Sequence, residues 1–452
     1  MDLAFLNFPD APPPPPTAAY SHAVRAGDWL FVTGQLGVDP RIGSLVPGGA
    51  VAQCRQVMHN LATVLAGAGT SLDRAVMTRI YLTDFGDYPA VNAEYAHHFA
   101  PGKLPARTSV GVTALALGGA KLTLSPGDTQ QKVELGNSEA ARLIDQGVTV
   151  LIGPFSSLVA FSVRQVTEKN KTPFMLLAAV ADNLTEGGLR YVFRVQPNGK
   201  AMATVTMMNI AEMAKAANMP LKRVAMMHED GNFGTTMGNH VEAFGGQLGY
   251  TVVQRIPYSI KSPDFTAELS KVKASKPDLL VISGYYGDSK IIAETASKLR
   301  IGVHALVGLA NAAYSNPKFI ADNRELTDQL FDGNYWHNPQ SARAKAVFAA
   351  YEKRFSSTLT SHGVQAYTVI YVVKDALERA GSADRDKVRD ALAKTNLTDH
   401  ILPQDAIKFD DTGENANASP ALLQVQNGKP VVVGPARFAE AKPVFPVPKW
   451  HG

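Results

Sequence analysis

The chain has 452 residues, of which 45% are hydrophobic and 19% charged, and its formal net charge is +4. These values are ordinary for a globular protein, and the length predicts about three folding units. The absence of a basic run argues against nucleic-acid binding. A single cysteine, Cys54, excludes an internal disulfide. No apolar run approaches the roughly 18 residues of a membrane span.

The N-terminal segment reads "MDLAFLNFPDAPPPPP". It lacks the basic start and the long apolar stretch of a secretory signal, so it predicts a cytoplasmic chain. The five prolines at 12–16 predict an extended polyproline II tether.

The next hundred residues predict a compact α+β domain. Val51, Cys54, Met58, Leu61 and Leu65 are spaced three or four apart, which is one face of a helix that ends near Gly67. Strict alternation elsewhere indicates half-buried strands. The predicted elements are strands at 28–38, 75–84 and 107–117 and helices at 51–69 and 88–99.

Beyond residue 130 the pattern changes to short apolar runs that alternate with helical patterns, which predicts parallel sheets covered by helices. There are too many units for one sheet, so two lobes are expected. The predicted helices lie at 137–147, 155–170, 233–249, 264–275 and 289–300, and the strands at 148–153, 173–180, 223–230, 251–258, 278–286 and 304–310. Three helical patterns between 341 and 396 precede a hairpin with Asn427-Gly428 as its turn.

The motifs "FVTGQLGV", "VNAEYAHHF" and "LPARTSVGV" stand in this order between residues 31 and 112. Together they resemble the reactive-intermediate deaminase family, the RidA or YjgF-like proteins. The resemblance implies an α+β RidA-like (chorismate-mutase-like) domain over residues 1–119. It also implies homotrimers with clefts between subunits, in which active members hydrolyse imines and enamines.

Arg107 matches the arginine that this family uses to hold a substrate carboxylate, a task for which guanidinium geometry is suited. Without the resemblance, a surface ion pair is an equal alternative. Tyr20, Thr33 and Asn92 match neighbouring cleft positions. The family's last strand supplies a catalytic carboxylate, but the equivalent "KLTLS" at 121–125 has no Asp or Glu. We therefore expect weak or absent deaminase activity.

The stretches "GVTVLIGPFSS", "LTEGGLRYVFRVQPN" and "VAMMHEDGNFG" resemble the substrate-binding proteins of branched-chain amino-acid ABC transporters. This resemblance implies a two-lobed α/β type I periplasmic binding protein over 120–452, whose lobes close on a small ligand. The expected lobe limits are about 120–197 with 334–400 for the first lobe, and about 198–333 with 401–440 for the second.

In this family a ligand carboxylate is held by a serine hydroxyl and the amides at a helix N-terminus, where the helix dipole favours an anion. Ser156 and Ser157 match that position, and a plain helix cap is the structural alternative. Ala178 and Val180 match the next ligand loop. Phe233 and Tyr285 match aromatic positions on the second lobe, although each could be core.

Amino-acid-binding members hold the ligand ammonium with a glutamate, but this chain has Ala310 and Asn311 there. A buried ammonium without a counter-charge is costly, so a neutral amide or an apolar or aromatic carboxylate fits better unless Glu229, Asp230 or Asp288 substitutes.

Family members also begin with a strand and a helix that are missing here, and the deaminase-like domain stands in their place. "KLTLS" suits either sheet, and we assign it as a strand of the second unit.

The sequence thus predicts a binding protein for an amino-acid-like, amide or carboxylate ligand, with no cofactor, no metal and no nucleic acid. An ABC permease is an expected partner if the chain is exported. The alternative is a 2-iminoacid or enamine deaminase with a fused ligand-sensing module. A recombined gene product that folds poorly is a third account.

Overall fold

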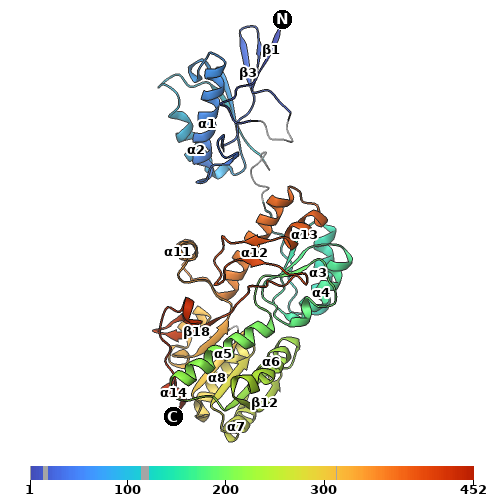
Figure 1. The fold of residues 1–452 in the computed structure, drawn as a ribbon, viewed down its shortest axis with the longest axis vertical. Helices are drawn as coiled ribbons and strands as arrows, with labels where there is room; N and C mark the ends of the chain where they lie inside the picture. The colour runs from blue at the N-terminus through green and yellow to red at the C-terminus, as the bar shows by residue number, and fades with distance from the viewer. Residues whose placement is uncertain (1, 14–18, 113–121, 312, 452) are drawn as a thin grey trace. The chain divides into compact units, whose positions relative to one another are not determined.

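In a computed structural model of the chain, residues 2–13, 19–112, 122–311 and 313–451 are described. The chain divides into two compact units, Met1–Leu124 and Ser125–Gly452. Each unit is described by itself, with element labels as in Figure 1.

The first unit is the predicted α+β domain. Strands β1 (Leu3–Leu6), β2 (Ala23–Ala26) and β3 (Trp29–Val32) form an antiparallel sheet, and β6 (Met77–Leu82) pairs in parallel with β7 (Ala106–Gly111). A short β4 (Val38–Asp39) pairs with β5 (Ser44–Leu45), and two helices complete the unit, α1 (Gly49–Gly67) and α2 (Tyr88–Ala96). Residues 113–117 of the last predicted strand lie outside the described residues.

Side chains of α1, of α2 and of the residues just after α2 form a small core in this unit. Met58 of α1 packs with Tyr95 and Phe99, and the half-buried Cys54 packs against this cluster. Burial raises the pKa of the Cys54 thiol, as expected for a small hydrophobe rather than a nucleophile.

The second unit contains two lobes, and the first is built on a parallel sheet in the order β10-β9-β8. These strands are β8 (Leu151–Ile152), β9 (Phe174–Leu176) and β10 (Val192–Arg194). Alternate side chains face opposite layers. Phe174, Leu176 and Val192 pack with α3 (Val133–Asp145) and α4 (Ser157–Lys169), whereas Met175 and Phe193 pack with α12 (Ser361–Ala380) and α13 (Arg385–Ala393).

The second lobe has a larger sheet, in the order β12-β11-β13-β14-β15-β18-β19. Strands β11 to β15 pair in parallel, whereas β18 pairs antiparallel with β15 and forms the predicted hairpin with β19. The strands are β11 (Arg223–Glu229), β12 (Thr251–Tyr258), β13 (Leu279–Ser283), β14 (Ala305–Leu309), β15 (Phe331–Asn334), β18 (Ala421–Gln426) and β19 (Lys429–Gly434). All five residues of β13 are buried.

Helices cover the second lobe's sheet, and α5, which the sequence patterns did not predict, is the longest of them. They are α5 (Gly199–Ala216), α6 (Asn232–Leu248), α7 (Thr266–Ala274), α8 (Tyr286–Leu299), α9 (Pro317–Asp322) and α10 (Arg324–Thr327). The C-terminal α14 (Pro448–His451) also belongs here, because Trp450 is buried in the same core and its carbonyl accepts a hydrogen bond from the Val303 amide.

The first lobe extends further along the chain than the sequence predicted. Ile401, Leu402, Ile407 and Phe409 pack in the cluster that contains Met175 of the first lobe, so the assignment of residues after 400 to the second lobe is wrong for this stretch. The short β16 (Asn396–Leu397) and β17 (Ile407–Lys408) pair with each other here, and α11 (Ala342–Phe355) precedes them.

The predicted strand at "KLTLS" is also wrong where it is described. Residues 122–125 belong to no strand, and Leu122 and Leu124 are exposed. A strand requires a free neighbouring edge in register, and alternation in sequence alone does not supply one. Pro126, one residue further on, lies against α3, since its carbonyl accepts a hydrogen bond from Arg142.

Among the described residues, no helix is long and apolar enough to cross a membrane. The described part of the chain also contains no cluster of His, Cys, Asp or Glu arranged to hold a metal ion.

A candidate ligand-binding site between the two lobes

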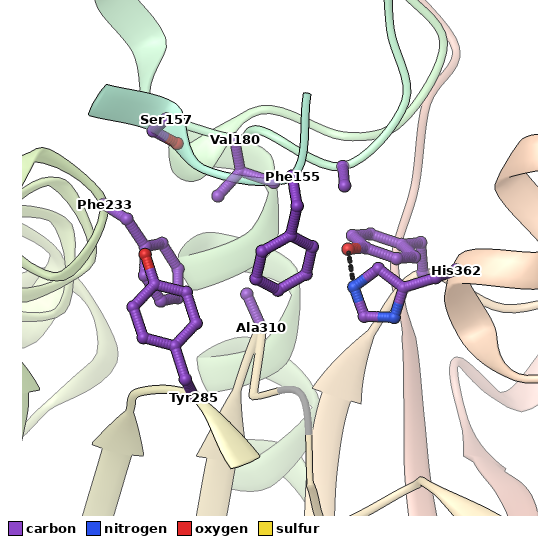
Figure 2. Close-up of a pocket in the computed structure, with 9 residues that line it drawn as sticks. Phe155, Ser157, Val180, Phe233, Tyr285, Ala310 and His362 are labelled. Atoms are coloured by element: carbon purple, nitrogen blue, oxygen red, sulfur yellow. Dashed lines mark hydrogen bonds between the residues drawn. The ribbon is translucent and has the colours of Figure 1, made fainter. Parts of the chain in front are cut away.

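A pocket in the second unit is lined by residues of both lobes and is partly open to solvent. Segments of the first lobe contribute Phe155, Ser157, Ala178, Val180 and His362, and segments of the second contribute Phe233, Tyr285, Ala310 and Tyr335 (Figure 2). Five of the six residues predicted for the second unit are therefore brought together: Ser157, Ala178, Val180, Phe233 and Tyr285.

The N-terminus of α4 forms one wall of the pocket. Ser157 is the first residue of the helix and is buried, and its Oγ accepts a 3.3 Å hydrogen bond from the Ala181 amide. Ser156, the sixth predicted residue, stands at the N-cap but makes no capping hydrogen bond with its side chain. The plain-cap alternative is therefore not what the structure shows. The first-turn amides and the positive end of the helix dipole have no side-chain cap.

Five rings form a continuous series across the site. Phe233 contacts Tyr285 with ring centroids 5.7 Å apart, and Tyr285 contacts Phe155 at 5.6 Å. Phe155 in turn lies 5.0 Å from His362, which meets the Tyr335 ring edge-on at 5.4 Å. Phe155 comes from the loop between β8 and α4 and stands in the middle of the pocket in Figure 2.

Four of the nine lining residues were not among the predicted ligand contacts: Phe155, Ala310, Tyr335 and His362. Phe155 directly precedes the serine pair, so its place beside the predicted site was a usable signal. Tyr335 directly follows β15, and His362 lies in the first turn of α12. Both are far along the chain from the predicted ligand residues, and no local sequence pattern there indicates a ligand.

The polar groups next to His362 are paired with one another. The Tyr335 hydroxyl and the His362 Nε2 are 2.9 Å apart. Burial lowers the pKa of His362 to about 4, so the imidazole is neutral near pH 7. It therefore presents no positive charge to a bound solute.

In the first unit, Arg107 lies on β7 and its guanidinium is engaged within the domain. Its Nη2 donates to the Tyr88 hydroxyl at 2.7 Å, and its Cζ lies 4.9 Å from the centre of the Tyr95 ring. Thr33 donates from Oγ1 to the Ser21 carbonyl at 2.7 Å. None of the hydrogen bonds or ring contacts among the described residues joins Arg107 to Tyr20, Thr33 or Asn92.

The comparison with family models decides what the larger unit is. A model described as "Periplasmic binding protein" matches residues 108–430, which is most of the chain. The chain belongs to the periplasmic binding protein family. A second model, described as "Endoribonuclease L-PSP", matches residues 11–122 and corresponds to the RidA-like domain. The two matches overlap over residues 108–122.

Individual relatives agree with this family. Leu/Ile/Val-binding protein homolog 8 from Brucella abortus is 27% identical over 337 residues, which cover 72% of this chain and 83% of the relative. A leucine-binding protein from Thermotoga maritima superposes with a TM-score of 0.60 at 23% identity, covering 79% of this chain and 97% of its own. A solute-binding protein from R. palustris, solved with benzoate, gives 0.57 at 17% identity and covers 80% and 96%.

The chain is thus a periplasmic binding protein that also carries a RidA domain.

Proposed function

We propose that this chain delivers a small solute to an ABC permease, and that it holds the carboxylate or amide oxygen of that solute at the N-terminus of α4. The observation that supports this is the uncapped first turn of α4, which opens into a pocket shared by both lobes. Backbone amides at a helix start are a ready-made anion site. The Ser157 and Ser156 hydroxyls are the side-chain donors of this site. Ala178 and Val180 form the wall behind the ligand.

The solute would close the two lobes upon itself. Ser157 and Phe233 belong to different lobes, so a ligand that touches both stabilises the closed arrangement over the open one. The curated relatives are named for leucine, isoleucine and valine, which share a carboxylate.

A thermal-shift screen of small carboxylates and amides tests this function on the full chain. We expect at least one compound to raise the melting temperature, and we expect Ser157→Ala to weaken its binding about tenfold, through loss of one charge-assisted hydrogen bond. The matched control is Ser138→Ala on α3, whose exposed hydroxyl is remote from the lining residues. A screen in which no compound shifts the transition would contradict the proposal.

For the first unit we propose self-association into a homotrimer. Its β1-β2-β3 sheet presents two apolar rows on an exposed face, since Phe5 pairs across Val24 with Phe31, and Leu3 pairs across Ala26 with Trp29. Phe5 is 68% exposed and Phe31 is 63% exposed. An apolar face of this kind marks an interface. Sedimentation of the full chain as a monomer at micromolar concentration would contradict it.

The deaminase alternative keeps Arg107, Tyr20, Thr33 and Asn92 as cleft residues between subunits. Its arginine is already engaged by Tyr88, and residues 122–125 supply no carboxylate. We therefore propose little or no imine hydrolysis, which an assay with a 2-iminoacid substrate decides. The sequence predicted a cytoplasmic chain, whereas delivery to a permease takes place in the periplasm. Cell fractionation distinguishes the two.

A further inference from the structure

The walls of the interlobe pocket carry no formal charge. The described lining residues include no Asp, Glu, Lys or Arg, and their single imidazole is neutral for the reason given above. A solute enclosed here thus meets one polar end, at α4, and otherwise uncharged side chains.

The first of the nearby buried acids, Glu229, is engaged at the start of α6. Its Oε2 accepts from the Gly231 amide at 2.7 Å and its Oε1 accepts from the Gly234 amide at 2.6 Å. Both carboxylate oxygens are therefore directed to backbone donors of its own lobe. Glu229 is buried but does not line the pocket.

The second buried acid, Asp288, has the same kind of role at the start of α8. It accepts a 2.7 Å hydrogen bond from the Tyr258 hydroxyl and 3.1 Å hydrogen bonds from the Tyr285 amide. A third buried acid, Asp332 on β15, accepts a 3.0 Å hydrogen bond from Asn334 and does not line the pocket, and Asp230 is exposed at the protein surface. None of the described lining residues is thus an acid, and burying an ammonium that meets no acid on the pocket wall is strongly unfavourable.

The opposite side of the pocket is apolar and aromatic. The methyl group of Ala310 projects from the end of β14, and Phe233, Tyr285, Phe155 and His362 supply ring faces and edges. Figure 2 shows the hydroxyl end of Tyr285 directed toward the side on which Ser157 and Val180 lie, whereas His362, whose Nε2 is paired with the Tyr335 hydroxyl, lies on the other side of Phe155. Planar rings pack favourably against such walls in offset and edge-on contacts.

From this arrangement we infer that the site selects a small carboxylate with an uncharged aromatic tail and discriminates against α-amino acids. The inference rests on the proposed function and gives its substrate class. The carboxylate binds at α4, and the tail occupies the ring-lined space toward Ala310.

Two pairs of compounds test the inference by calorimetric titration of the full chain. L-phenylalanine differs from 3-phenylpropanoate only by the ammonium group, and L-leucine differs from 4-methylpentanoate in the same way. We expect 3-phenylpropanoate to bind at least tenfold more tightly than phenylalanine, and more tightly than 4-methylpentanoate. Equal or tighter binding of either amino acid overturns the selection against ammonium, while leaving the proposed function intact. Tighter binding of 4-methylpentanoate overturns the aromatic preference. Binding of none of the four overturns this inference, and the broader screen described above then decides the function.

A charge added at Ala310 provides a second test. Ala310→Glu places a carboxylate on the pocket wall, and we expect it to improve phenylalanine binding relative to 3-phenylpropanoate by at least tenfold. Ala310→Gln has nearly the same size without the charge and should keep the wild-type ranking. An Ala310→Glu protein with a native circular dichroism spectrum and an unchanged ranking would contradict the placement of the tail. If that variant does not fold, the wild-type comparison still decides.

Discussion

Among the described residues, the main sheet of the first lobe has three strands and that of the second lobe has seven, although both lobes line one side of the same candidate ligand site. In the second lobe the central β13 is flanked by strands on both sides, and every residue of it is buried. In the first lobe the two-residue β8 is a terminal strand of the described sheet. The comparison shows that a binding lobe can keep a ligand wall in place without a wide sheet.

Polar side chains connect the segments of the first lobe instead. The fully buried Arg194 on β10 pairs with Glu414 at 3.0 Å, which joins the two segments of the lobe, far apart in sequence. Arg385 of α13 donates to the carbonyls of Ile144 and Val148 at 2.9 and 3.0 Å, next to β8. Hydrogen bonds and an ion pair of charged side chains therefore join the segments that make up the first lobe.

The largest expected effect comes from breaking the buried pair of the first lobe. Glu414→Gln leaves the Arg194 guanidinium without its counter-charge in a site from which water is excluded, so we expect a loss of about 4 kcal/mol in the free energy of unfolding. Calorimetric unfolding of the full chain measures it. Lys318→Gln, which removes an exposed pair with Asp322, is the control and should cost less than about 1 kcal/mol. Similar losses for the two variants would refute the role of the pair.

A matched pair of apolar truncations tests the difference between the sheets. Leu280→Ala in β13 removes a fully buried side chain, and we expect a cost of about 3 kcal/mol. Ile152→Ala in β8 removes a partly buried side chain at the edge, and we expect about 1 kcal/mol. Urea unfolding of both variants gives the ranking. A cost for Ile152→Ala that equals that of Leu280→Ala would show that β8 is as firmly packed as the central strand.

The smallest effect is on the pH dependence of stability and concerns His337, which lies three residues after the end of β15. Burial lowers the pKa of His337 from 6.5 to about 4. The unfolded chain therefore takes up a proton that the folded chain does not, so stability is complete above pH 6.5 and is lost as the pH falls toward 4. We expect His337 to contribute a loss of about 2 kcal/mol at most between pH 7 and pH 5.

His337→Phe keeps a ring against Phe348, whose centroid lies 4.1 Å from that of the histidine, and removes the titration. The melting temperature of this variant should fall less steeply between pH 7 and pH 5 than that of the wild type. Parallel curves over this range would show that His337 is protonated equally well in both states.

Much of this architecture followed from periodic patterns. The alternation of helices and apolar runs predicted the parallel strands, and Asn427-Gly428 predicted the hairpin between β18 and β19. The strand prediction at 122–125 was wrong because alternation of apolar and polar residues, although typical of a strand, does not specify the neighbouring strand with which the segment would pair. The predicted boundary of the first lobe was wrong because Ile407 and Phe409 pack in the same core as Met175, more than two hundred residues away in the sequence. A pattern read over a short stretch of sequence cannot contain such a contact.

The site was predictable where it followed a strand or opened a helix, as at Ser157, Phe233 and Tyr285. The family resemblance supplied these positions, and Phe233 and Tyr285 also agree with the general geometry of α/β sheets, whose ligands bind where strands end. The positions of Tyr335 and His362 depend instead on how the segment after β15 and helix α12 pack next to the site. Sequence patterns assign such residues a helix or a strand, but not a neighbour on the other lobe.

The five-ring series has a consequence for any measured affinity. Phe155 already contacts Tyr285 and His362, so a solute must displace the Phe155 side chain before it can contact those two rings. Each aromatic contact that is given up offsets about 0.5–1.5 kcal/mol of what the newcomer gains. The Phe155 side chain therefore competes with the solute for these ring contacts. A smaller side chain at position 155 would remove this competition and raise the affinity for the solute.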